Sequence, residues 1–171
     1  MNYENNLGMQ SVNVDFNPPG DIVIENISHR DVVESGDDME IRYRLKNLGP
    51  NKLEGQGCND VLYLSTDQTF SPDDILLGNI DHNIVLPNYS YEEYSFTAHI
   101  SGIPEGEYFI IIYGDARNSF YEVDENNNRG YSAYPFEVKV SELFFDTPVT
   151  FKLKDLVHKD FKLNIYGNIN E

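Results

Sequence analysis

The chain has 171 residues, with 12 Lys and Arg against 29 Asp and Glu, and a formal net charge of −17. A surface this negative repels phosphate backbones and anionic lipid headgroups over roughly 8–10 Å at physiological salt, which excludes nucleic acid and acidic membranes as expected partners. The single cysteine, Cys58, excludes an intrachain disulfide and a cysteine-cluster zinc site, and no apolar run is long enough for membrane insertion.

Residues 1–20 look like the end of one module followed by a linker. Asn5-Asn6-Leu7-Gly8-Met9 matches Asn127-Asn128-Arg129-Gly130-Tyr131, and an alternating apolar stretch follows each copy. The repeat predicts that residues 1–16 are the last strand of a preceding module, with Pro18-Pro19 as a stiff linker. The first residues have neither the basic start nor the apolar core of a secretory signal, so an export signal is not expected within this chain.

Residues 21–140 alternate between apolar and polar positions, and this period of two predicts strands. Met39, Ile41, Tyr43 and Leu45 alternate with charged residues, which predicts a strand with one buried and one charged face. Residues 108–113 form the most apolar stretch, so we place them at the centre of the fold. Further strands are predicted at 61–64, which is apolar enough to be covered on both faces, and at 94–100 and 136–140.

Turn-forming residues separate these segments, and no stretch shows the period of a helix. The turns are expected at 35–37, 47–50, 71–74, 86–88 and 104–106. Short strands at regular spacing without helices predict an all-β fold, an immunoglobulin-like antiparallel β-sandwich. Tyr108 follows the turn at Gly106, so its hydroxyl is predicted to bond to upstream backbone as a tyrosine corner.

Residues 141–171 differ from the unit that precedes them. Val149, Phe151 and Leu153 alternate, and so do Phe161, Leu163 and Ile165. These stretches predict a linker and the first strands of a following β-domain that is truncated at Glu171. The alternative is that both ends of the chain are extra strands of one sandwich.

Short motifs follow one another through residues 21–140. They are Asp21–Ile24, Lys46–Gly49, Leu62–Ser65, Asp74–Gly78, Ile103–Tyr108, and Asp115 leading into Glu122 and Glu125–Asn128. Their order and spacing resemble the CARDB family, the cell-adhesion-related domain found in bacteria. The resemblance implies an immunoglobulin-like sandwich that is repeated in secreted or cell-surface proteins beside other β-domains or a protease, and it carries no catalytic residues.

Catalytic motifs are not visible in the sequence. His29, His82, His99 and His158 occupy separate loops or exposed alternate positions, and none is near Cys58 along the chain. Cys58 itself is interpreted as a loop thiol. No phosphate-binding loop, metalloprotease motif or nucleophile elbow occurs, so we expect the chain not to be an enzyme.

Two loops are rich in the oxygen ligands that calcium prefers. In an immunoglobulin-like sandwich they are expected to approach the same end, and calcium is the one cofactor that the sequence predicts. The alternative is that these Asp and Asn side chains only bond to their own turns. The candidate ligands are Asp67, Asp73, Asp74, Asp115, Asn118, Glu122, Asp124, Asn126 and Asn128.

Tyrosines beside acidic residues predict a second kind of site, a platform of rings that binds carbohydrate or peptide. The alternative is that these rings end strands or pack on a sheet. The candidate platform residues are Tyr89, Tyr91, Tyr94, Tyr131 and Tyr134.

The function expected from these features is a non-catalytic adhesion or binding module of a tandem extracellular array, with a protein or carbohydrate ligand. The first alternative is a passive, calcium-stabilised spacer that positions a neighbouring catalytic domain and contacts only the β-domains beside it. A second alternative is an intracellular assembly component that pairs through an edge strand.

Overall fold

A computed structural model describes residues 10–13, 17–142 and 161–162, and these residues form strands and connections without a helix. None of them therefore belongs to a helix that could cross a membrane. The strands are β1 (Ile22–Ser28), β2 (Val32–Glu34), β3 (Asp37–Asn47), β4 (Leu53–Ser65), β5 (Ile75–Leu86), β6 (Tyr91–Ile100), β7 (Gly106–Tyr113), β8 (Arg129–Tyr131), β9 (Phe136–Lys139), β10 (Ser141–Glu142) and β11 (Phe161–Lys162).

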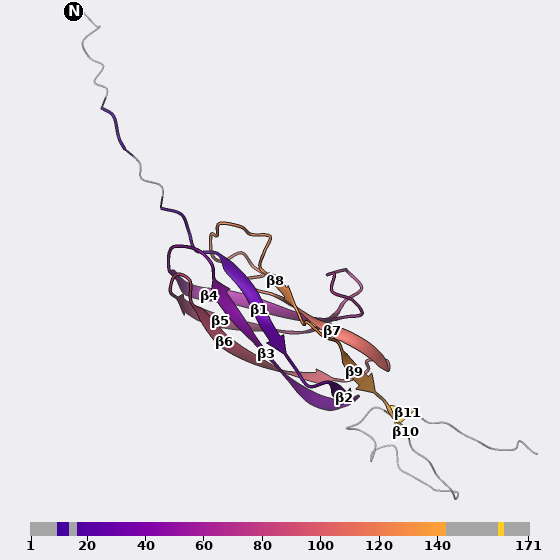
Figure 1. Cartoon of the computed structure of the whole chain (residues 1–171). Coiled ribbons are helices and arrows are strands. Elements are labelled where there is room, and N and C mark those ends of the chain that lie inside the picture. The colour runs from indigo at the N-terminus through magenta and orange to yellow at the C-terminus, as the bar shows by residue number, and fades with distance from the viewer. Residues whose placement is uncertain (1–9, 14–16, 143–160, 163–171) are drawn as a thin grey trace, which may run out of the picture.

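Two sheets make up the sandwich (Figure 1). The first has the order β1-β3-β6, and the second has the order β2-β9-β7-β4-β5 with β8 also paired to β7. All pairs within these two sheets are antiparallel except β2 with β9. The predicted antiparallel β-sandwich is confirmed, and β7 lies in the middle of its sheet as the apolar run 108–113 predicts.

The core lies between the sheets and follows the predicted alternation. Met39, Ile41, Tyr43 and Leu45 of β3 are at most 1% exposed, while Glu40 and Arg42 between them are exposed. Buried residues of β4, β7 and β9 in the second sheet, among them Leu62, Ile110 and Phe136, belong to the same core cluster. The tyrosine corner is confirmed, because the Tyr108 hydroxyl donates a hydrogen bond to the Pro104 carbonyl at 3.0 Å.

Strand β5 is not predicted by the alternation. It lies at the edge of the second sheet, where one face of a strand meets little apolar surface. Ile84 and Leu86 point into the core, but Asp81, His82 and Asn83 interrupt the pattern that would reveal the strand. Bulges interrupt its pairing with β4 between Gly55 and Cys58 and between Leu62 and Tyr63. The alternation along the sequence therefore does not show the register of the pair.

The two ends are described only in part. Residues 10–13 are not in a strand and Val12 is 78% exposed, so the strand predicted within 1–16 is not formed there, while Val14 and Phe16 lie outside the described residues. At the other end β10 pairs in parallel with β11, which contains Phe161. Val149, Phe151, Leu153, Leu163 and Ile165 lie outside the described residues.

Candidate functional site

A buried polar cluster lies between the sheets where β4 and β5 pair. The bulge after Gly55 sets the register so that Cys58 of β4 lies opposite His82 of β5. Asp60, two residues after Cys58 on the same face, completes a group whose sulfur, carboxylate oxygen and imidazole nitrogen all lie within 4.8 Å of one another. Cys58 and Asp60 are fully buried, and the side chain of His82 is 10% exposed.

Asp60 is the centre of this cluster because its two oxygens accept every hydrogen bond in it. Oδ2 lies 2.6 Å from the Tyr43 hydroxyl and 2.9 Å from His82 Nε2. Oδ1 accepts from the backbone N–H of Asp115 at 3.1 Å and from the Cys58 thiol at 3.7 Å. The ring of Tyr94 lies 4.3 Å from that of His82. A buried carboxylate needs this many donors to offset its lost hydration.

The interpretations of Cys58 as a loop thiol and of His82 as a loop or exposed residue are wrong. Both residues lie in paired strands, and the sequence does not reveal this because β5 is not predicted and its register is set by a bulge. His29 bonds to a backbone carbonyl and His99 bonds to Asp38, while His158 lies outside the described residues.

The cluster does not have the properties of a cysteine nucleophile. Burial, with the nearby charge of Asp60, raises the pKa of the Cys58 thiol, so the thiol stays protonated at neutral pH. Reactive cysteines have a lowered pKa and are partly exposed. His82 and Cys58 both bond to Asp60, which differs from the arrangement in which a base takes the proton of its nucleophile.

The acidic residues of the loop between β7 and β8 accept hydrogen bonds from other residues of the loop and from β1. Asp115 accepts from the N–H groups of Ser119 and Phe120 at 3.0 and 2.9 Å. Glu122 accepts from the N–H of Ile22 and, at 2.9 Å, from the side chain of Asn128. In the same loop, Asp124 accepts from the N–H of Asn126, and Asn118 has a left-handed φ of 50° within a turn.

The second acidic loop, between β4 and β5, lies at the other end of the sheet. Ser65 at the end of β4 pairs with Phe109 near the start of β7, whereas Val61 pairs with Tyr113 where β7 ends. The two loops therefore leave opposite ends of this strand pair, and Figure 1 shows them well apart. The expectation that they meet at one end is wrong.

The acidic residues of this second loop make local turns. Asp67 accepts from the N–H of Thr69 at 2.6 Å, and Asp74 accepts from the N–H of Ser71 at 2.8 Å. Asp73 donates its own N–H to the Ser71 hydroxyl. The bonds of Asp67 and Asp74 are those that the alternative interpretation predicts for the Asp side chains. In the first loop, however, Glu125 Oε2, Asn127 Oδ1 and Asn128 Oδ1 are buried without a partner among the described residues.

Glu122 gives the loop a pH-dependent stability. Burial raises its pKa from 4.5 to about 7, against the lowering effect of the two hydrogen bonds that it accepts. Between pH 4.5 and 7 the folded chain holds a proton that the unfolded chain has released, so this group makes the free energy of unfolding fall as pH rises through that window. When measured by urea unfolding, the free energy of unfolding of the unsubstituted chain should include a fall between pH 4.5 and 7 that Glu122→Gln does not show. Equal pH profiles would contradict it.

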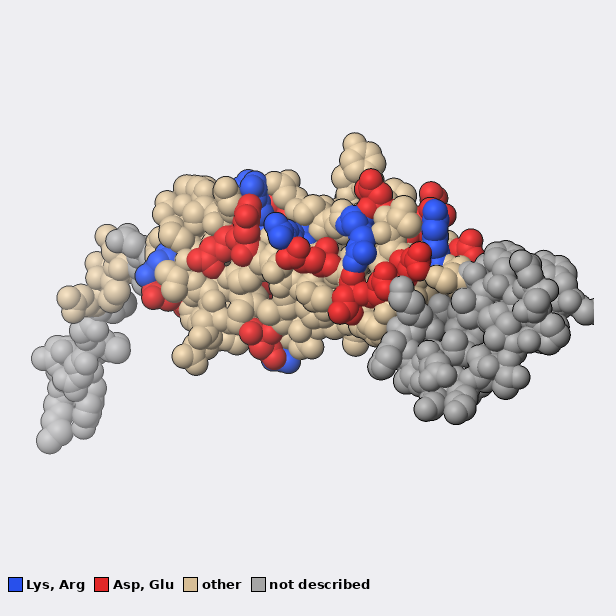
Figure 2. Space-filling model, turned by 90° about the horizontal axis from the view of Figure 1, so that it is seen from below, with Lys and Arg blue, Asp and Glu red and all other residues tan. Residues whose placement is uncertain are grey.

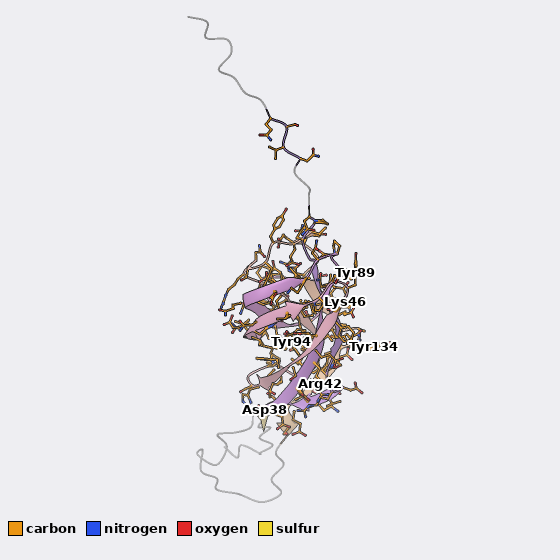
Figure 3. The ribbon with its side chains drawn as sticks, turned by 90° about the vertical axis from the view of Figure 1, so that its left-hand side faces the viewer. Asp38, Arg42, Lys46, Tyr89, Tyr94 and Tyr134 are labelled. Atoms are coloured by element: carbon orange, nitrogen blue, oxygen red, sulfur yellow. The ribbon has the colours of Figure 1, made fainter. Side chains whose placement is uncertain are left out.

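The five predicted platform tyrosines do not share one surface. Tyr91 pairs with Lys46 and faces outward, while Tyr94 pairs with Tyr43 and faces the core. Tyr131 belongs to the second sheet, and Figure 3 shows Tyr134 on the opposite side of the sandwich from Tyr94. The prediction of one platform fails because Tyr91 and Tyr94, three apart in β6, point to opposite faces, and because Tyr131 lies in the other sheet.

The outer face of the first sheet is charged. Asp38, Arg42 and Lys46 follow one another along β3 (Figure 3). Arg44 is paired with Glu93 at 2.9 Å and Lys46 with Glu25 at 3.0 Å. Acidic and basic side chains also lie side by side on the face seen in Figure 2. Such a face is well solvated and offers little apolar surface to a partner.

The outer face of the second sheet is apolar over part of its area. Leu76, Tyr63, Ile111 and Tyr131 are opposite one another across β5, β4, β7 and β8. Phe70, from the loop after β4, packs edge-on against Tyr63 with ring centroids 4.9 Å apart. The loop thus covers part of Tyr63, which stays half-buried like Val61, so the run 61–64 is fully covered on its inner face only.

Arg129 joins this group by placing its guanidinium 4.8 Å from the Phe70 ring centroid and 4.6 Å from that of Tyr113. Leu76 is 61%, Tyr131 55% and Phe70 38% exposed. The outward face of an antiparallel sheet is usually polar, so this group departs from the norm. We call it the outer-face patch; it consists of Tyr63, Phe70, Leu76, Arg129 and Tyr131.

Two solved structures with a similar fold are structures of one CARDB domain. The crystal structure of the CARDB domain of the PF1109 protein from Pyrococcus furiosus, described as a complex with di-metal ions, is 22% identical with a TM-score of 0.52 and covers 72% of this chain and 97% of that one. The solution structure of the same domain is 23% identical with a TM-score of 0.51 and covers 71% and 96%. No curated protein matches the chain in sequence.

The family model of CARDB matches residues 19–131, which include every strand of the two sheets except β9, and all of the buried cluster. This span is more than half of the chain. The chain therefore belongs to the CARDB family.

Proposed function

We propose that the chain is a non-catalytic binding module that recognises a protein through the outer-face patch, as part of a bacterial secreted or cell-surface protein. The observation that carries the proposal is a partly exposed group of aromatic, aliphatic and Arg side chains where a polar surface is expected. Aromatic and Arg residues supply most of the binding energy at protein interfaces.

A protein ligand fits this patch better than a carbohydrate. Phe70 stands edge-on to Tyr63, and Arg129 covers a face of Phe70 and a face of Tyr113. Leu76 adds an aliphatic group that is 61% exposed. Sugar rings stack on open aromatic faces, whereas packed rings beside an aliphatic side chain complement the apolar centre of a protein interface.

The test compares two double variants on arrays of extracellular proteins and of glycans. Leu76→Ser with Tyr131→Ser removes the exposed part of the patch, and Tyr89→Ser with Tyr121→Ser removes tyrosines that are 65% and 77% exposed elsewhere. Array proteins bound by the chain should bind the patch variant at least about tenfold more weakly and the control equally well. Binding to glycans alone, equal binding by both variants, or no binding to either array would overturn the proposal.

The second candidate is a calcium-stabilised spacer that positions a neighbouring domain such as a protease. It is supported by the three unpartnered oxygens of Glu125, Asn127 and Asn128 in the loop between β7 and β8. The related domain of PF1109 is described as a complex with di-metal ions. This candidate expects a higher melting temperature in millimolar calcium than in EDTA, and an unchanged melting temperature would reject it.

A further inference from the structure

We propose that Cys58, Asp60 and His82 form a binding site for one divalent transition-metal ion of the zinc class. The three side chains offer a sulfur, an oxygen and a nitrogen within 4.8 Å of one another. This set suits zinc or cobalt, whereas calcium and magnesium prefer oxygen ligands only. A single cysteine excludes a cysteine cluster but not a mixed site of this kind.

The separations within the cluster suit a metal at its centre. Zinc bonds of about 2.0–2.3 Å to oxygen, nitrogen and sulfur place tetrahedral ligands roughly 3.3–3.7 Å apart. His82 Nε2 lies 2.9 Å from Asp60 Oδ2, and Cys58 Sγ lies 3.7 Å from Asp60 Oδ1. The three ligand atoms already lie within 4.8 Å of one another, so side-chain rotation can bring them to bonding distance of one ion, and a water can take the fourth position.

The surroundings hold the three side chains in place. Asp60 is oriented by the Tyr43 hydroxyl at 2.6 Å and by the backbone N–H of Asp115 at 3.1 Å. The ring of Tyr94 lies 4.3 Å from that of His82. Outer groups of this kind commonly orient metal ligands and strengthen binding.

Hydrogen bonding alone leaves the cluster incompletely satisfied. His82 Nδ1 is buried without a partner among the described residues, and the thiol contact to Asp60 is a weak hydrogen bond. A bond from the sulfur to a metal would replace this weak contact, with His82 bonding through Nε2, the ring nitrogen that faces Asp60.

A metal ion can reach the site from the edge of the sandwich. β5 and β6 are the edge strands of their sheets and follow one another along the chain. His82 on β5 has the one partly exposed side chain of the three, whereas Cys58 and Asp60 lie behind it. On binding, the S–H bond of Cys58 breaks, its proton goes to solvent, and the sulfur bonds to the metal.

The test is a titration of the reduced, chelator-treated full chain with Co²⁺. A single equivalent should produce a thiolate-to-cobalt charge-transfer band and the visible bands of a tetrahedral ion, and Zn²⁺ should abolish both. Cys58→Ser should remove the charge-transfer band. His82→Gln should weaken cobalt binding at least about tenfold, whereas His99→Gln, which changes an exposed histidine bonded to Asp38, should not.

Melting curves without metal show whether each variant folds, and His82→Gln provides the test if Cys58→Ser does not. No charge-transfer band in the unsubstituted chain would overturn the proposal, as would the same band in folded Cys58→Ser. Equal cobalt affinity in His82→Gln and His99→Gln would also overturn it. None of these results depends on the outer-face patch, so the binding function is tested separately.

Discussion

Asp60→Ala is expected to lower the free energy of unfolding by about 3–5 kcal/mol when measured by urea denaturation in EDTA. The substitution leaves the Tyr43 hydroxyl, the N–H of Asp115 and the side chains of His82 and Cys58 without their shared partner. Each buried donor that loses its acceptor costs about 1–3 kcal/mol, and the missing carboxylate also leaves a cavity.

Asp81→Ala is the matched control. Asp81 accepts from Asn59 at 2.9 Å and from Arg117 at 2.7 Å, but its side chain is 56% exposed. Water replaces the bond to the exposed Arg117, and the buried Asn59 amide loses one acceptor, so the loss should stay at about 1–2 kcal/mol. A loss at Asp60 no larger than that at Asp81 would show that the buried network contributes little to stability.

Asn47→Ala is expected to cost about 2–4 kcal/mol because one buried amide joins three parts of the fold. Its Oδ1 accepts from the N–H groups of Asp21 at 3.0 Å and Gly49 at 2.9 Å. Its Nδ2 lies 2.7 Å from the carbonyl of Asn51 and 3.2 Å from those of Leu86 and Pro87. No other side chain of similar size can serve both sets.

Asn47→Asp separates the two roles of this amide. Aspartate keeps the two accepted bonds but sets a carboxylate against carbonyl oxygens, so urea denaturation should show a loss at least as large as that of Asn47→Ala. Asn83→Ala, on the exposed side of β5, should change the free energy of unfolding by less than about 0.5 kcal/mol. Similar losses at Asn47 and Asn83 would contradict this account.

The sequence predicts the strands that bury either one regular face or a continuous apolar run. β3 is recognised because its buried residues alternate with charged ones, and β7 because its run of isoleucines is covered on both sides. β5 is missed because it lies at an edge and carries Asp81, His82 and Asn83 in its middle. The strands that periodicity reveals are those that bury the most apolar surface.

The buried cluster depends on register, which the sequence does not display. Cys58 and His82 meet only because a bulge after Gly55 shifts the pairing of β4 with β5. The predictions of one tyrosine platform and of one site from two acidic loops are wrong for a related reason. Residue types alone do not show which face of a sheet, or which end of a strand, a residue occupies. The motif Lys46–Gly49 does mark a structural site, because the hydrogen bonds of Asn47 require an amide there.

The parallel pairing of β2 with β9 bears on how the module responds to tension. The chain enters the sandwich near residue 20 at one end and leaves it after β9 at the other (Figure 1). β2 and β9 run in the same direction, with Val32 opposite Glu137 and Glu34 opposite Lys139. A pull applied through the two ends loads this pair in shear, so its hydrogen bonds must break together and not one after another.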